Sequence, residues 1–200
     1  MTISAKQVKE LRDKTGAGFM ECKSALSEAD GHLDDAVTIL RTRGQAQADK
    51  RAGRSTSQGL IGHYIHQGGQ VGVLVEVNCE SDFVARTDDF TTLVKEIAMH
   101  IAAADPTCVT REEVSTENLE HEKAIYHAQF ENTNKPPQVI DKIVEGKIRS
   151  YYEQVVLLDQ PSIRDPKTTI GAMVTAAIAK LGENITVTRF SRFKVGESSE

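Results

Sequence analysis

The sequence predicts an α+β fold, in which a core of antiparallel sheet packs against helices and a three-helix segment precedes it. Three observations predict it. Apolar side chains recur at helical spacing in the first 40 residues, β-branched residues alternate along 60–66 and 71–79, and a helical period then returns before a last β-branched run at 185–190. Strands and helices that come in separate blocks are typical of this fold class.

The first 40 residues predict three short helices. Ser4 is a favourable N-cap for the first helix, and Val8 and Leu11 lie on one of its faces. The glycines of Thr15-Gly-Ala-Gly18 predict a tight reversal before the second helix. The side chains expected to face inward from the second and third helices are Met20, Cys22, Ala25, Leu26, Leu33, Ala36, Val37 and Leu40.

Residues 41–58 are basic and lose the apolar period, which predicts a helical extension that fades into a linker. No aromatic residue lies among these cations to stack on a base, so a solvated hinge is favoured over a nucleic-acid contact. We therefore expect an N-terminal module with its basic linker at 1–54 and an α+β core at 55–200.

The core begins with a predicted hairpin. Residues 60–66 and 71–79 are β-branched runs joined by Gln67-Gly-Gly-Gln70, a connection that suits two antiparallel strands. A helix is then expected from Thr87 to the break at Asp105-Pro106. The valines expected on one face of the second strand are Val71, Val73, Val75 and Val77.

The second half predicts three helices and a strand. The acidic, polar stretch 107–135 is expected to contain a surface helix, and a stronger one follows Pro136-Pro137 and ends before 159–167. A last helix is expected from Thr168, with Gly182 as its C-terminal glycine. The strand at 185–190 is expected to pair with the hairpin.

Composition favours a soluble protein whose partner is another protein. The 200 residues are 39% hydrophobic and 26% charged with a formal net charge of −5, which repels phosphate backbones and argues against direct nucleic-acid binding. No stretch reaches the roughly 20 apolar residues of a membrane span, and the first residues, with Glu10 and Asp13 and without an apolar run, are not expected to act as a signal peptide. Three widely spaced cysteines without CxxC indicate a reducing compartment, so we expect a cytoplasmic location.

No enzyme motif is found: the sequence lacks GxGxxG after a strand, a Walker sequence, GxSxG and HExxH. His63 and His66 are three apart on a strand, on opposite faces, and Cys79 ends an apolar strand as a small buried hydrophobe. We therefore expect no catalytic residue, no metal ligand and no cofactor. An enzyme that uses these three residues remains an alternative.

The segment 78–86 carries an aromatic residue where polar turn residues are expected. Phe83 follows Asp82 directly after the second strand. Phe83 either folds back as a plug over the sheet or protrudes as an apolar anchor beside a charge, the combination found in interface hot spots. Periodicity does not separate these two interpretations.

Three separated segments resemble the elongation factor Ts family. Residues 8–26 are similar to its opening signature, residues 59–69 with 75–86 to its second, and residues 178–185 with the close at 192–197 to a third. The resemblance covers nearly the whole chain and is vaguest in the acidic stretch 107–135. At Ser81 the family commonly has Thr, and at Glu21 it commonly has Asp.

The resemblance implies a ubiquitin-associated-like N-terminal module on a dimerising α+β core, and a homodimer. It also implies a guanine nucleotide exchange factor that binds the GDP form of elongation factor Tu, displaces magnesium and promotes GDP release so that GTP binds. The residues matching the magnesium-displacing motif are Ser81, Asp82, Phe83 and Val84. The residues implied to contact the GTPase from the module are Thr15, Gly16, Ala17, Gly18, Phe19 and Lys23. The alternative is a ubiquitin-associated-type adaptor whose α+β domain only dimerises.

Overall fold

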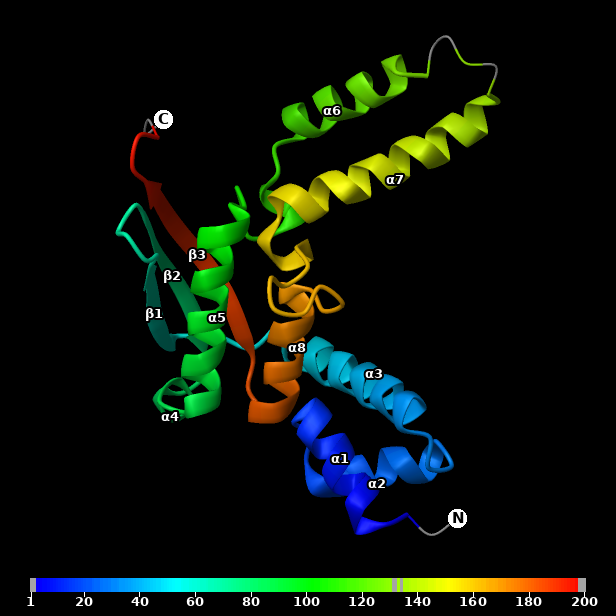
Figure 1. Ribbon diagram of the computed structural model, residues 1–200, viewed down its shortest axis with the longest axis vertical. Helices are drawn as coiled ribbons and strands as arrows, with labels where there is room; N and C mark the ends of the chain where they lie inside the picture. The colour runs from blue at the N-terminus through cyan, green and yellow to red at the C-terminus, as the bar shows by residue number, and fades with distance from the viewer. Residues whose placement is uncertain (1–2, 131–132, 134, 198–200) are drawn as a thin grey trace. The chain divides into compact units, whose positions relative to one another are not determined.

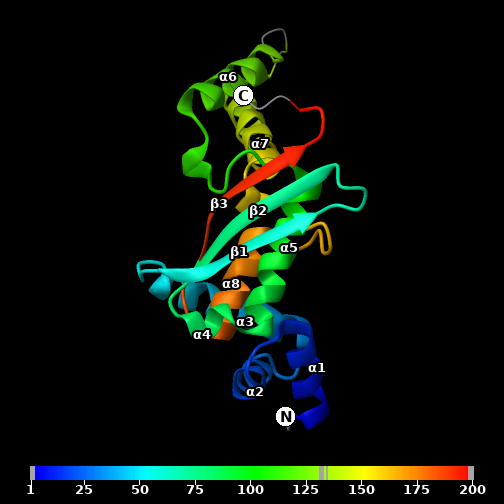
Figure 2. The same cartoon turned by 90° about the vertical axis from the view of Figure 1, so that its left-hand side faces the viewer.

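The computed structural model describes residues 3–130, 133 and 135–197. Figures 1 and 2 show its elements. The helices are α1 (Ala5–Thr15), α2 (Phe19–Glu28), α3 (Leu33–Arg51), α4 (Asp82–Ala85), α5 (Asp88–Ala104), α6 (Thr116–Ala128), α7 (Pro137–Val155) and α8 (Ile170–Leu181), with 3-10 turns η1 (Arg111–Glu113) and η2 (Leu157–Asp159). The strands are β1 (Gln58–Ile65), β2 (Val71–Cys79) and β3 (Ile185–Lys194). The α+β class is thereby confirmed.

The strands form one antiparallel sheet in the order β1-β2-β3, so the predicted hairpin and its pairing with the last strand are confirmed. Side chains alternate along β2: Val73, Val75 and Val77 are at most 1% exposed, whereas Leu74 is half exposed. One face of the sheet therefore belongs to the core, and Figure 2 shows α5 behind it.

Helix α5 supplies the apolar layer against this sheet, through buried Phe90, Ile97 and Ile101. A Cβ at Gly62 of β1 would lie 2.3 Å from a methyl group of Val94, so only glycine permits this close approach of strand and helix. The helix ends at Ala104, as the Asp105-Pro106 break predicts.

Helices α1, α2 and α3 form a small bundle. Ser4 caps α1 in a capping box with Gln7, and Val8 and Leu11 are buried with the inward side chains of α2. Met20 corrects the prediction, because its side chain is 70% exposed. It lies two residues before buried Cys22, about 200° away around the helix and therefore off the apolar stripe. The ubiquitin-associated-like character stays a prediction.

The predicted helical extension that fades into a linker within residues 41–58 is confirmed, because α3 continues to Arg51 and β1 begins at Gln58. Its buried positions there are Gly44 and Ala48, residues too small to produce an apolar period. A Cβ at Gly44 would lie 3.5 Å from the Cβ of Ala179, an ordinary van der Waals distance, so α3 and α8 are neighbours at this position. The domain boundary between residues 54 and 55 stays a prediction.

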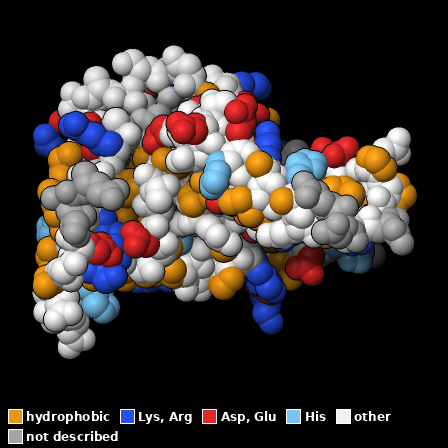
Figure 3. All heavy atoms as spheres, turned by 90° about the horizontal axis from the view of Figure 1, so that it is seen from above, with side chains coloured by type: hydrophobic (Ala, Val, Ile, Leu, Met, Phe, Trp, Pro, Cys, Tyr) orange, Lys and Arg blue, Asp and Glu red, His pale blue; other side chains and the backbone are white. Residues whose placement is uncertain are grey.

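The described chain divides into two compact units. The first comprises Met1–Leu60, Val77–Leu93 and Met173–Thr186, and the second comprises Ile61–Glu76, Val94–Ala172 and Val187–Glu200. The acidic stretch contributes α6, none of whose side chains is fully buried, which agrees with the predicted surface helix. Acidic and basic side chains lie next to one another on the face drawn in Figure 3. None of the helices in the described chain is long and apolar enough to cross a membrane.

His100 is a buried titratable side chain of α5, only 1% exposed. Gln160 donates from Nε2 to the carbonyl of Gln154, so its Oε1 faces His100 Nε2 at 2.9 Å and requires a proton on that nitrogen. Within the described residues His100 Nδ1 has no hydrogen-bond partner. Burial lowers the pKa of His100, because the charged ring would lose its hydration in the core, and this effect exceeds the opposing one of the hydrogen bond with Gln160.

We predict that acid destabilises the fold through His100. The pKa of this ring is lowered in the folded protein, so at pH below its ordinary value of 6.5 the unfolded chain binds a proton that the folded chain does not. The contribution of His100 to the free energy of unfolding should be complete above pH 6.5 and should decrease as the pH falls below that value. Replacement His100→Gln keeps an Nε2 donor for Gln160 without a titrating ring. Urea titrations should give it a flatter stability profile than the parent between pH 7 and 5, and identical slopes would contradict the prediction.

Candidate functional site: an exposed motif and a glycine loop

Residues 81–84, here called the 81–84 motif, follow the end of β2 directly. Ser81 has extended backbone and is the N-cap of α4, and its Oγ accepts a hydrogen bond from the Val84 amide at 3.4 Å. Cys79 donates from Sγ to the Ser81 carbonyl at 3.1 Å. A capped turn of only four helical residues thus joins β2 to α5.

Phe83 projects into solvent with 79% of its surface exposed. The interpretation of Phe83 as a core plug is therefore wrong, and its ring protrudes from the surface. Asp82 lies beside it and pairs with Arg86 at 2.8 Å, both side chains being well exposed. The motif presents a large apolar ring and a carboxylate together, while Ala85 is buried beneath them.

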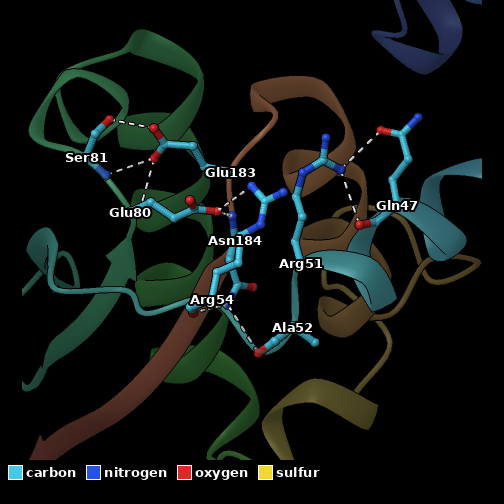
Figure 4. A network of polar contacts seen from close by, with 8 residues as sticks. All are labelled: Gln47, Arg51, Ala52, Arg54, Glu80, Ser81, Glu183 and Asn184. Carbon is cyan, nitrogen blue, oxygen red and sulfur yellow. Dashed lines mark hydrogen bonds and ion pairs between the residues drawn. The ribbon is translucent and has the colours of Figure 1, made fainter.

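Glu183 supports the motif from a segment far along the chain. Its carboxylate accepts a hydrogen bond from the Ser81 amide at 3.0 Å and one from the Ser81 hydroxyl at 2.6 Å, as Figure 4 shows. Sequence reasoning missed this residue. The one signal for it was its position within the third family-like segment, residues 178–185.

The loop of residues 15–19, here called the glycine loop, is held by local hydrogen bonds. Gly16 adopts φ 68°, a left-handed conformation that ends α1 and that other residues rarely adopt. Thr15 donates from Oγ1 to the Leu11 carbonyl at 2.7 Å, and Gly18 donates its amide to Glu21 Oε2 at 3.1 Å. The Glu21 side chain thus caps the start of α2.

The predicted contact residues of the module divide into two groups. Phe19 is 49% exposed, and Gly16, Gly18 and Lys23 are also exposed. Thr15 and Ala17 are half-buried, and Ala17 packs against the core of the bundle. Met20, which sequence reasoning assigned to the core, adds a second large apolar side chain beside Phe19.

Lys180, near the end of α8, lies close to both parts of the site. Its side chain passes the glycine loop, where a Cβ at Gly16 would meet its Cδ at 3.6 Å. Its Nζ pairs with Asp89 at 2.7 Å, at the start of the helix that follows the 81–84 motif. Both parts of the site belong to the first compact unit.

The alternative nucleophile and metal ligands are poorly placed for chemistry. Burial raises the pKa of Cys79, and the nearby Glu183 charge raises it further, which disfavours the thiolate that a nucleophile requires. His63 and His66 are both exposed, and His66 shares a hydrogen bond with Tyr64. Among the residues that the structure describes, no group of three potential ligands could hold a metal ion.

Comparison with known proteins identifies similar chains over almost the full length. The family model described as "Elongation factor TS" matches residues 4–197. An elongation factor Ts from Solibacter usitatus is 57% identical over 196 residues, 98% of this chain and 92% of the relative. Those from Koribacter versatilis and Fervidobacterium nodosum are 56% and 55% identical, and cover 100% and 98% of this chain and 91% and 100% of the relatives.

We predict that the two phenylalanines on either side of the α4–α5 junction respond differently to truncation. Phe83→Ala should change the free energy of unfolding by less than about 0.5 kcal/mol, because the ring is already in solvent. Phe90→Ala, the matched control, should cost about 3–5 kcal/mol, because Phe90 is fully buried. Thermal and urea unfolding of both variants test this. A large loss of stability in Phe83→Ala would contradict the prediction and indicate that Phe83 packs in the core.

Proposed function

Because this chain belongs to the elongation factor Ts family, we propose that it is a guanine nucleotide exchange factor for elongation factor Tu in translation elongation. It binds the GDP form, displaces magnesium from the nucleotide site and promotes GDP release so that GTP can bind. The observation that carries the proposal is the exposure of Phe83 on a short capped helix, beside the carboxylate of Asp82.

The geometry of the 81–84 motif supports insertion into a partner. A large apolar side chain that is 79% exposed contributes nothing to the core of its own protein, and its burial against another protein is favourable. Because Ser81 caps α4 and Ala85 is buried, the backbone of the motif is already ordered before binding. Less conformational entropy is then lost when the partner is bound.

Exchange follows from thermodynamic linkage. A factor that binds the nucleotide-free GTPase more tightly than the GDP-bound GTPase weakens GDP binding by the same ratio, and about 1.4 kcal/mol of difference corresponds to tenfold. Magnesium neutralises phosphate charge in GTPase sites. Insertion of the 81–84 motif would move the groups that hold the ion, so GDP would lose part of its charge compensation.

The module contributes a second set of contacts in this proposal. Phe19 and Met20 expose apolar surface at the start of α2, and Lys23 adds a positive charge one turn later. The glycine loop brings its own backbone close to the surface, because neither Gly16 nor Gly18 carries a side chain. We assign this region to contacts with the GTPase domain.

The family resemblance also implies a homodimer, and we propose that its contact is the outward face of the sheet in the second compact unit. Leu74 points away from the core, and it lines one hollow with Ile65, Phe193 and Val195. All four side chains are at least half exposed. A second copy related by a two-fold axis would cover this apolar surface with the same surface.

We further propose that the chain makes and breaks no covalent bond and uses no cofactor, since its action is the differential binding of two states of the GTPase. The cytoplasm, where translation elongation takes place, is its proposed location.

The decisive measurement is the rate of GDP release from elongation factor Tu, followed with a fluorescent GDP at fixed magnesium concentration. We predict that the parent accelerates release and that Phe83→Ala and Asp82→Ala each slow it by tenfold or more. Their effects should not add, because the two residues are adjacent. Asp82→Ala should leave the stability of the free protein nearly unchanged, since its pair with Arg86 is exposed.

Two outcomes would contradict this function. A parent protein that binds the GTPase without accelerating release would indicate an adaptor, and Phe83→Ala with the parental release rate would remove the motif from the mechanism. A suitable control is Ile163→Ala, an apolar side chain of the second compact unit that is 47% exposed and belongs neither to the 81–84 motif nor to the proposed dimer face.

We predict a dimeric mass in light scattering at micromolar concentration. Leu74→Glu should shift the mass to that of a monomer, because it places a charge within the apolar face, while circular dichroism stays unchanged. Glu145→Gln, a change on exposed α7, is the control and should remain dimeric. A monomeric parent protein would contradict the dimer without affecting the exchange proposal.

A further inference from the structure

Three hydrogen-bond donors at the end of β2 converge on the carboxylate of Glu183. Oε2 accepts the amide protons of Glu80 and Ser81, at 3.1 and 3.0 Å, and Oε1 accepts the Ser81 hydroxyl proton at 2.6 Å. Figure 4 shows the side chain reaching these groups from the segment between α8 and β3. Hydrogen bonds to an ionised carboxylate are stronger than hydrogen bonds between neutral groups, so these three bonds hold Glu80 and Ser81 firmly against Glu183.

The segment that carries Glu183, residues 182–184, is itself fixed. Gly182 adopts φ 77°, which ends α8 with a left-handed residue. Asn184, two residues after Gly182, is 3% exposed. Its carboxamide donates to the carbonyls of Ala52 at 3.4 Å and Arg54 at 2.9 Å. Glu183 therefore extends from an anchored backbone.

The two segments bind each other reciprocally. The carboxylate of Glu183 accepts the amide of Glu80, and the carboxylate of Glu80 accepts the amide of Asn184 at 2.7 Å. Arg54 lies 3.4 Å from the Glu80 carboxylate and partly compensates its charge. This arrangement fixes both position and direction of the backbone that enters α4.

Helix α4 depends on such external support. It has only four residues, too few to be stable by its own hydrogen bonds. Its N-cap, Ser81, bonds with Glu183 through its amide and hydroxyl, while the same oxygen accepts the Val84 amide. A rotation of Ser81 would therefore change the orientation of Asp82, which pairs with exposed Arg86, and of Phe83, which is 79% exposed.

We propose that Glu183 is a positioning residue for the 81–84 motif: its carboxylate fixes the direction in which α4 presents Asp82 and Phe83 to the GTPase. The inference rests on the proposed exchange function of that motif. In this proposal Glu183 acts through its hydrogen bonds with Ser81. Its effect is on the geometry of insertion.

The chemistry of the site distinguishes a carboxylate from an amide. Glu183→Gln keeps one oxygen for the two backbone amides but replaces the other by an NH₂ group, which cannot accept the Ser81 hydroxyl proton. Glu183→Ala removes all three bonds and leaves the amides of Glu80 and Ser81 without their acceptor. The exchange activity should therefore decrease in the order parent, Gln, Ala.

The first measurement is the maximal rate of GDP release from elongation factor Tu at saturating concentrations of each variant. Glu183→Ala should lower this rate about tenfold, with the concentration for half-maximal effect changed less than threefold, because the other contacts with the GTPase remain. Glu183→Gln should lie between Ala and the parent. Glu96→Gln, which removes a half-buried carboxylate paired with Arg164 in the second unit, should release GDP at the parental rate.

The second measurement repeats the substitution in the Phe83→Ala background. If Glu183 acts by orienting Phe83, Glu183→Ala should lower the rate of GDP release little further once the Phe83 ring has been removed. A general structural role would instead lower the rate by the same factor in both backgrounds. Equal factors, or a parental rate in Glu183→Ala, would overturn the proposal.

The third measurement is independent of exchange activity. In the free parent protein, hydrogen exchange at the amides of Glu80 and Ser81 should be protected, and Glu183→Ala should raise their exchange rates at least tenfold while the amides of β1 keep theirs. Unchanged protection would overturn the proposal whatever the release assay gives. A parent that fails to accelerate release would refute the proposed function, and the amide measurement would then decide on the contact between Glu183 and Ser81 alone. Should Glu183→Ala fail to fold, Glu183→Gln replaces it in the two release measurements, where a smaller decrease of the rate is expected and a parental rate would overturn the proposal. The parent alone then serves the amide measurement, and unprotected amides of Glu80 and Ser81 would overturn the proposal.

Discussion

Polar groups at the end of β2 require hydrogen-bond partners, and the segment between α8 and β3 supplies them. Where a strand stops, its amides lose their partners in the sheet, and leaving them buried and unpaired would cost free energy. The carboxylate of Glu183 takes two amides and a hydroxyl there. Asn184 in turn binds the backbone after α3. The position of α4, and with it the exposed motif, depends on these bonds.

Exposed apolar side chains of the site extend from ordered backbone. Phe83 and Met20 are among the most exposed large hydrophobic residues of the described chain, and each lies in the first turn of a helix. An aromatic ring such as that of Phe83, held by an ordered backbone, loses little entropy on binding, which is the property of an interface anchor. The folding free energy comes from other residues, such as Phe90 and the buried valines of β2. Buried side chains that stabilise the fold and exposed ones proposed to contact a partner thus lie only a few residues apart.

The prediction for Met20 was wrong, whereas the predicted helical extension after residue 40 is confirmed although no apolar period marks it, and the two outcomes have related reasons. Met20 is apolar but lies off the stripe defined by Cys22, Ala25 and Leu26, so its type suggested burial while its position does not allow it. The later part of α3 is helical although its apolar period disappears, because Gly44 and Ala48 are buried through their small size. In both cases residue type was a poor guide to whether a side chain meets a neighbouring element.

The sequence by itself determined the order of the elements, the paired strands and the membership of the family, because helix and strand periods and long motifs are properties of neighbouring residues. Only the tertiary structure decided whether Phe83 is a core plug or an exposed ring, since a single aromatic in a turn belongs to no period. It also revealed Glu183, whose bonds to Ser81 join positions 102 residues apart. Contacts over that separation arise from how the chain folds back on itself, and no local pattern encodes them.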